Sequence, residues 1–85
     1  MRFEVIVSSK AQKGLKKIPL EWRRRIWLYL DRLCFDPYIG KKLEGKYKND
    51  YSIRIWPYRI IYTVRKKQLI IDVIEIEHRG GAYKK

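Results

Sequence analysis

Two arginines in the second half of the chain are spaced so that they could bind one phosphate together. Residues 51–56 and 58–65 alternate apolar and polar side chains, as β-strands with one buried face do, and a tight connection at Trp56-Pro57 separates them. The alternation places Arg54 and Arg59 on the same face of the expected hairpin. The opposite face holds the better candidates for a hydrophobic core, namely Ile53, Ile55, Ile60 and Tyr62.

This arginine pair calls for an explanation, because like charges on neighbouring strands repel each other. Nothing nearby in the sequence obviously neutralises Arg54 and Arg59. A folded protein tolerates such clustering most readily where it binds an anion, typically phosphate. An ordinary solvated face with outward arginines is the alternative interpretation.

The end of the chain adds further candidates. Cleavage of RNA without a metal needs a base for the 2′-OH proton, cations for the charged transition state and an acid for the leaving 5′-oxygen. His78 is the only histidine, the residue type best suited to proton transfer near neutral pH, and it is followed by Arg79. Gly80-Gly81 would let the tail pack closely against the sheet or a phosphate. A structural role is the alternative interpretation for this histidine.

The charge of the chain favours a polyanionic partner. There are 21 Lys and Arg residues against 9 Asp and Glu among 85, a formal charge of +12. Nucleic acid, the ribosome or an acidic protein would suit this charge. Anionic membrane is less attractive, because the basic residues are not confined to one face of an amphipathic helix. For the run Arg23-Arg24-Arg25 a solvated helix face is the simpler interpretation, and a contact with nucleic acid or an acidic partner is the alternative.

Several classes of protein are disfavoured by composition. No apolar run approaches the ~18–20 residues of a membrane span. The N-terminus does not resemble a signal peptide, since Glu4 interrupts its apolar stretch, so we expect a cytoplasmic protein. One His and one Cys make a structural zinc site unlikely, and Cys34 fits the core of a helix better than a reactive thiol.

The first half of the chain predicts a strand and two helices. Residues 2–7 alternate as a strand, and Ser8-Ser9 then offers an N-cap for a short helix that Pro19 closes. Ser9 with Gln12 has the spacing of a capping box. From residue 20 to about 35, apolar side chains at helical spacing predict an amphipathic helix, with Trp22, Ile26, Leu30 and Leu33 on its inner face.

The second half changes to the period of strands. After Asp36-Pro37 we expect a loop to Gly45, then the hairpin, a turn at residues 66–68 and a central strand over 69–77. The order β-α-α-β-β-β predicts a single α+β domain over residues 1–85, with a helical hairpin packed on a small, mainly antiparallel sheet.

Four segments together resemble the RelE/ParE superfamily of toxins from toxin–antitoxin systems. The resemblance covers the whole chain, and its ending is especially similar to the archaeal RelE branch. The segments are Leu43-Glu44-Gly45, Tyr51-Ser52-Ile53-Arg54-Ile55, Tyr58-Arg59-Ile60-Ile61-Tyr62 and His78-Arg79-Gly80-Gly81-Ala82-Tyr83.

The resemblance implies a ribosome-dependent endoribonuclease that cuts mRNA in the A site without metal or cofactor. Arg54 corresponds to a basic residue of the RelE site, Arg59 to the arginine that stabilises the transition state, and Arg79 to the residue proposed to protonate the leaving group. Tyr83 would stack on or orient the base. His78 and Arg79 could exchange the roles of acid and stabiliser, because the C-terminal segment is shorter than in some relatives.

Further basic residues are expected to contact RNA, and one expected cation is absent. Ser52 stands where some RelE toxins carry a basic residue, for which Lys48 could compensate. The expected RNA-binding residues are Lys41, Lys42, Lys46, Lys48, Arg65, Lys84 and Lys85.

The resemblance also implies partners and leaves alternatives open. In a toxin the partners would be the ribosome with its mRNA and a cognate antitoxin, an acidic and partly disordered chain that wraps the helices and the basic face of the sheet. The main alternative is the ParE branch, which shares the fold but acts on DNA gyrase. A basic RNA-binding module without catalysis is a third possibility.

Overall fold

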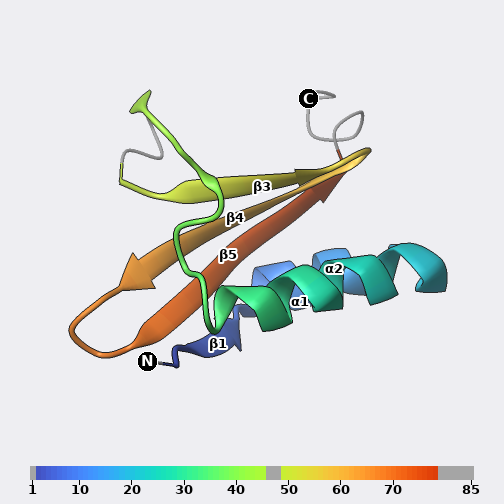
Figure 1. Cartoon of the computed structure of the whole chain (residues 1–85). Helices are drawn as coiled ribbons and strands as arrows, with labels where there is room; N and C mark the ends of the chain where they lie inside the picture. The colour runs from blue at the N-terminus through green and yellow to red at the C-terminus, as the bar shows by residue number, and fades with distance from the viewer. Residues whose placement is uncertain (1, 46–48, 79–85) are drawn as a thin grey trace.

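The computed structural model describes residues 2–45 and 49–78, which form two helices and a five-stranded sheet (Figure 1). Both helices lie on one side of the sheet. The elements are β1 (Glu4–Val7), α1 (Ser9–Lys16), α2 (Leu20–Leu33), β2 (Lys41–Lys42), β3 (Tyr51–Ile55), β4 (Tyr58–Arg65) and β5 (Ile70–His78).

The sheet confirms the predicted α+β fold and adds one strand to it. Its order is β1-β5-β4-β3-β2, with β1 parallel to β5 and every other pair antiparallel. The added strand is β2, whose two lysines pair with Ser52 and Tyr51 inside what the sequence predicted as a loop. Two lysines carry no alternation of apolar and polar residues, so the pattern could not reveal this strand.

The helix boundaries differ from the predicted ones by one or two residues. Of the two serines that offered an N-cap, Ser8 caps α1, since its hydroxyl accepts a hydrogen bond from the Ala11 backbone N–H at 3.0 Å. The predicted capping box is therefore wrong, and the Gln12 side chain instead donates to the carbonyl of Val7. Helix α2 ends at Leu33, two residues before the predicted end.

The predicted core residues of the hairpin face the helices. Ile60 and Tyr62 are fully buried, and Ile53 and Ile55 are each 7% exposed. They join one cluster with residues of both helices, which include Ala11, Leu15, Ile26, Leu30 and Leu33. The helical layer thus covers one face of the sheet and leaves the other to be lined by the alternate residues of β3, β4 and β5. None of the helices in the described residues has the length and apolar character that crossing a membrane requires.

A β-bulge in β5 changes which of its side chains point to the helices. Ile61 pairs with Glu75 but Tyr62 pairs with Val73, so Ile74 has no direct partner on β4. The Ser8 hydroxyl donates a hydrogen bond of 2.8 Å to the carbonyl of Ile74. The residue that caps α1 therefore also satisfies the backbone of the bulge, which ties the start of the helical layer to β5.

The segment between α2 and β2 is fastened to the sheet by one tyrosine. The buried Tyr62 hydroxyl donates to the Pro37 carbonyl at 2.9 Å and accepts from the Gly40 N–H at 3.0 Å. Burial raises the pKa of Tyr62 to about 12. A Cβ at Gly40 would lie 2.7 Å from this hydroxyl and from the Ser52 carbonyl, so the close approach requires glycine here.

Helix α1 packs directly on the backbone of β5 at Gly14. A Cβ built on Gly14 would lie 2.7 Å from the carbonyl oxygen of Ile76. Helix propensity alone would make this glycine a weak point of α1. The structure shows that its lack of a side chain allows the close contact between helix and strand.

We therefore predict that Gly14→Ala destabilises the protein. In an exposed helix this change stabilises by about 1 kcal/mol, but here the new methyl group must displace backbone, which costs about 1–3 kcal/mol. Urea denaturation should show a lower free energy of unfolding for Gly14→Ala, while Lys13→Ala on the exposed side of α1 stays near the native value. An increase in stability for Gly14→Ala would contradict this account of the packing.

Candidate functional site

A row of three charged residues crosses the face of the sheet opposite the helices. Arg54 of β3 pairs in register with Arg59 of β4, which pairs in turn with Glu77 of β5. The two-residue turn at Trp56-Pro57 and the pairing of Ile55 with Tyr58 set this register. The prediction that Arg54 and Arg59 share one face is therefore confirmed by the strand pairing.

Glu77 partly neutralises the arginine pair, contrary to the expectation from the sequence. Its Oε1 accepts hydrogen bonds from Arg59 Nη2 at 2.7 Å and from Arg59 Nε at 3.2 Å. The Glu77 side chain is 13% exposed and that of Arg59 32%, so the pair is half shielded from water. Arg54 is exposed and makes no side-chain hydrogen bond or ion pair with any residue that the structure describes.

The sequence alone could not place Glu77 because of the bulge. Strict alternation from the start of β5, where Ile71 and Val73 are buried, would put Glu77 on the helix-facing side. The extra residue at Ile74 reverses the alternation, and Glu77 comes to lie opposite Arg59. One feature of the sequence indicates the bulge. Ile76 can be a core residue only if the alternation changes within the strand.

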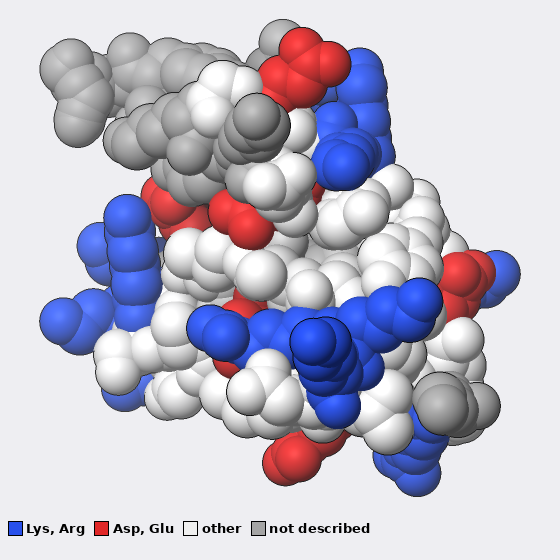
Figure 2. All heavy atoms as spheres, turned by 90° about the vertical axis from the view of Figure 1, so that its left-hand side faces the viewer, with Lys and Arg blue, Asp and Glu red and all other residues white. Residues whose placement is uncertain are grey.

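The face that carries these residues is mixed in charge and not simply basic. Arg65 forms an ion pair with Asp72, and Lys10 of α1 lies 3.5 Å from Glu75. Figure 2 likewise shows basic side chains in separate groups with acidic side chains between them on one side of the molecule. The expectation of a basic sheet face is therefore wrong for β5, which contributes carboxylates to it.

His78 lies on the other side of the sheet from the arginines. It pairs in register with Tyr58, a core residue, and the two rings meet edge to face with centroids 5.2 Å apart. Tyr58 also contacts Trp22 of α2 at 5.9 Å. The structure thus brings Arg54 and Arg59 together but places the exposed His78 against Tyr58 on the other face of the sheet.

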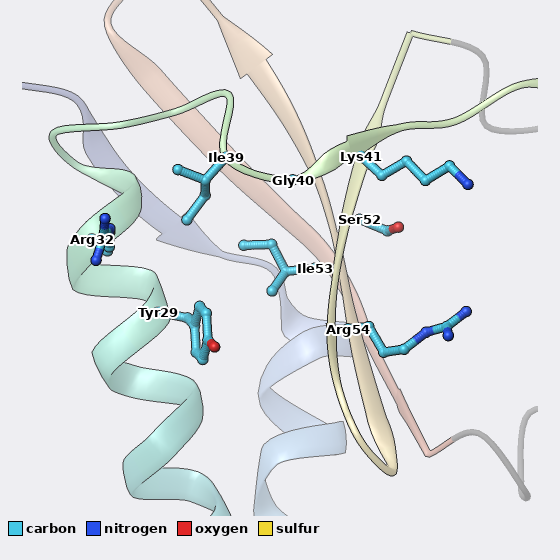
Figure 3. Close-up of a pocket in the computed structure, with 8 residues that line it drawn as sticks. All are labelled: Tyr29, Arg32, Ile39, Gly40, Lys41, Ser52, Ile53 and Arg54. Atoms are coloured by element: carbon cyan, nitrogen blue, oxygen red, sulfur yellow. The ribbon is translucent and has the colours of Figure 1, made fainter.

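A shallow pocket of about 380 Å³ adjoins the site on the outer edge of β3. Tyr29 of α2 and Ile53 face into it, whereas Lys41, Ser52 and Arg54 project from β2 and β3 on the side away from α2 (Figure 3). Lys41 is the register partner of Ser52, so it lies beside the arginine row.

Several predicted site residues lie outside the described part of the chain, and two others lie away from Arg54 and Arg59. Lys42 is exposed on β2, next to Lys41, and Arg65 stands at the far end of β4 from Arg59. The residues outside the described part are Arg79, Tyr83, Lys46, Lys48, Lys84 and Lys85.

The fold places the chain in the class of RelE-like toxins. It superimposes with a TM-score of 0.81 on RelE in the archaeal RelE–RelB complex of Pyrococcus horikoshii, at 29% identity over 94% of this chain and 98% of that one. The RelBE2 toxin–antitoxin complex of Mycobacterium tuberculosis gives a TM-score of 0.85 over 93% of this chain and 100% of that chain. Its identity of 21% supports the fold alone.

Sequence comparison gives the family. A family model described as "ParE toxin of type II toxin-antitoxin system, parDE" matches residues 5–83. A toxin homologue named RelE1 from Methanocaldococcus jannaschii is 28% identical over 99% of this chain and 98% of its own length. The chain therefore belongs to the RelE/ParE superfamily and is a toxin of a type II toxin–antitoxin system.

The charged row predicts opposite effects of two arginine substitutions on stability. Arg54→Gln removes one of two opposed like charges and should raise the free energy of unfolding by about 0.2–0.5 kcal/mol. Arg59→Gln leaves the Glu77 carboxylate without its partner and should lower it by about 1 kcal/mol. Urea denaturation at low salt measures both, and a larger loss for Arg54→Gln than for Arg59→Gln would contradict the assignment of the ion pair.

Proposed function

We propose that this toxin is a ribosome-dependent endoribonuclease that cleaves mRNA by attack of a 2′-OH on the adjacent phosphate. The observation that carries the proposal is the register pairing of Arg54 with Arg59 on the face that the helices leave open. Glu77 binds one of these two guanidinium groups, so the pair keeps a net positive charge that suits a further anion. A phosphodiester fits this requirement, since guanidinium donors match phosphate oxygens in geometry and charge.

The arginines would act by stabilising charge. A phosphate under attack by the 2′-oxygen gains negative charge on its non-bridging oxygens, and fixed cations at hydrogen-bond distance lower the energy of that state. Arg59 is held by Glu77 and so needs little reorganisation to serve this role. Arg54, which is exposed, would bind the same phosphate or the next one.

The other roles rest on the resemblance to RelE toxins. Arg79 would protonate the leaving 5′-oxygen and Tyr83 would stack on the base. The assignment of His78 to proton transfer stays a prediction, and its packing against Tyr58 gives it a structural role as well. Lys41 is well placed to contact RNA beside Arg54, and the remaining lysines of the predicted RNA-binding set would extend this surface.

The partners would be an antitoxin, the ribosome and mRNA in the cytoplasm. Solved relatives from Pyrococcus horikoshii and Mycobacterium tuberculosis are complexes of toxin and antitoxin, which supports a cognate antitoxin for this chain. A formal charge of +12 would speed encounters with an acidic antitoxin or with ribosomal RNA, and would make both encounters sensitive to salt.

Inhibition of DNA gyrase is the second candidate, because the matching family model is that of ParE toxins. The paired arginines favour the ribonuclease, since inhibition by binding alone does not require a site for a phosphate in its transition state. A basic module that binds RNA without cleaving it is less favoured for the same reason.

The proposal predicts that Arg59→Ala abolishes cleavage while the protein stays folded. Loss of one transition-state cation should reduce the rate of cutting ribosome-bound mRNA about 10²–10³-fold. Primer extension on mRNA from stalled ribosomes measures the rate, and Arg24→Ala, which removes an exposed arginine from α2, serves as the matched control. Native rates in Arg59→Ala would contradict the proposed role of this residue.

A further inference from the structure

The proposed reaction needs a proton acceptor, and the arginines cannot supply it. A guanidinium group is already protonated at neutral pH, so neither Arg54 nor Arg59 can take the proton of the attacking 2′-OH. Ser52 offers only a hydroxyl, and the His78 ring lies against Tyr58 on the helix-facing side of the sheet. We therefore look for the base among the other side chains that contact Arg54 or Arg59.

In the described part of the chain, Glu77 is the carboxylate that forms an ion pair with Arg59. Both hydrogen bonds from Arg59 go to its Oε1, and its Oε2 accepts none from any described residue. Two other carboxylates lie on this face: Asp72 pairs with Arg65, and Glu75 lies 3.5 Å from Lys10 of α1.

We propose that Glu77 is the general base of this toxin, an inference that rests on the proposed ribonuclease function. Oε2 of Glu77 takes the proton of the 2′-OH as the 2′-oxygen forms a bond to phosphorus. The bond from phosphorus to the 5′-oxygen then breaks, and the leaving oxygen receives a proton from the acid of the site, for which Arg79 is the candidate. The products are a 2′,3′-cyclic phosphate and a 5′-hydroxyl, and Glu77 returns its proton to solvent.

The Arg59–Glu77 pair suits this chemistry because it joins a group that can accept the proton to a group that can bind the phosphate. The guanidinium carries five N–H donors, and those on Nε and Nη2 bind the Glu77 carboxylate. The proton acceptor and the phosphate-binding group are thereby fixed one hydrogen bond apart. The attacking hydroxyl and the phosphorus it attacks are neighbours on one nucleotide step and would meet this unit together.

Two other roles for Glu77 make different predictions. If Glu77 only positions Arg59, a glutamine should serve almost as well, because its side-chain oxygen still accepts hydrogen bonds from the guanidinium. If Glu77 competes with phosphate for Arg59, removal of its charge should accelerate cleavage. A base is the one role for which glutamine is inactive while binding of RNA is preserved.

The test compares native protein with Glu77→Gln in single-turnover cleavage of ribosome-bound mRNA. A second measurement is the affinity for the same ribosome complex carrying a 2′-deoxynucleotide at the cleavage position, which cannot react. We expect Glu77→Gln to cleave at least 100-fold more slowly and to bind the deoxy complex as tightly as native protein or more tightly. Asp72→Asn, which neutralises another arginine-paired carboxylate on the same face, should cleave at the native rate.

The outcomes separate this inference from the function on which it rests. Cleavage by Glu77→Gln within threefold of native, or faster than native, would overturn the role of base and leave the ribonuclease intact. A matching loss of binding to the deoxy complex, or a lower melting temperature that accounts for the lost rate, would also overturn it. Absence of cleavage by the native protein would remove the proposed function itself, and the role of Glu77 with it.

Discussion

The site depends on how strand register and one bulge combine across β3, β4 and β5. The tight turn at Trp56-Pro57 sets Arg54 opposite Arg59, and the bulge at Ile74 then brings Glu77 opposite Arg59 from a strand whose first half has the other alternation. Ser8 fixes the bulge from the side of the helices by donating to its carbonyl. Without the bulge the carboxylate would point into the core, and two arginines would face each other with no nearby counter-charge.

The ion pair with Glu77 stabilises the two neighbouring arginines, and it engages Arg59 but not Arg54. Glu77 binds the Arg59 guanidinium and offsets its repulsion from Arg54, whereas Arg54 itself is exposed and has no side-chain partner among the described residues. The hydrophobic core lies on the opposite face, where Ile60, Tyr62 and their neighbours pack under α1 and α2. The hydrophobic core under the helices and the charged row thus lie on opposite faces of one sheet.

The sequence predicted the fold and the shared face of Arg54 and Arg59, but it did not predict that Glu77 joins them. The difference has a physical cause. Alternation is strict through β3 and β4, so the core residues and the shared face of Arg54 and Arg59 could be predicted. It fails within β5, where the bulge is set by long-range contacts with Ser8 and β4, and so neither the ion pair of Glu77 nor the contact of His78 with Tyr58 was predicted. The strand β2 was missed because its lysines form strand only through pairing with β3.

The central claim is that the paired arginines serve to cleave RNA. The most direct measurement incubates the native protein with translating ribosomes and, separately, with DNA gyrase and supercoiled plasmid, and then analyses the ends of the mRNA and the topology of the DNA. The account predicts cuts in ribosome-bound mRNA that leave 2′,3′-cyclic phosphate and 5′-hydroxyl ends, with gyrase unaffected. Intact mRNA together with loss of gyrase supercoiling would contradict it and assign the toxin to the activity of the ParE branch.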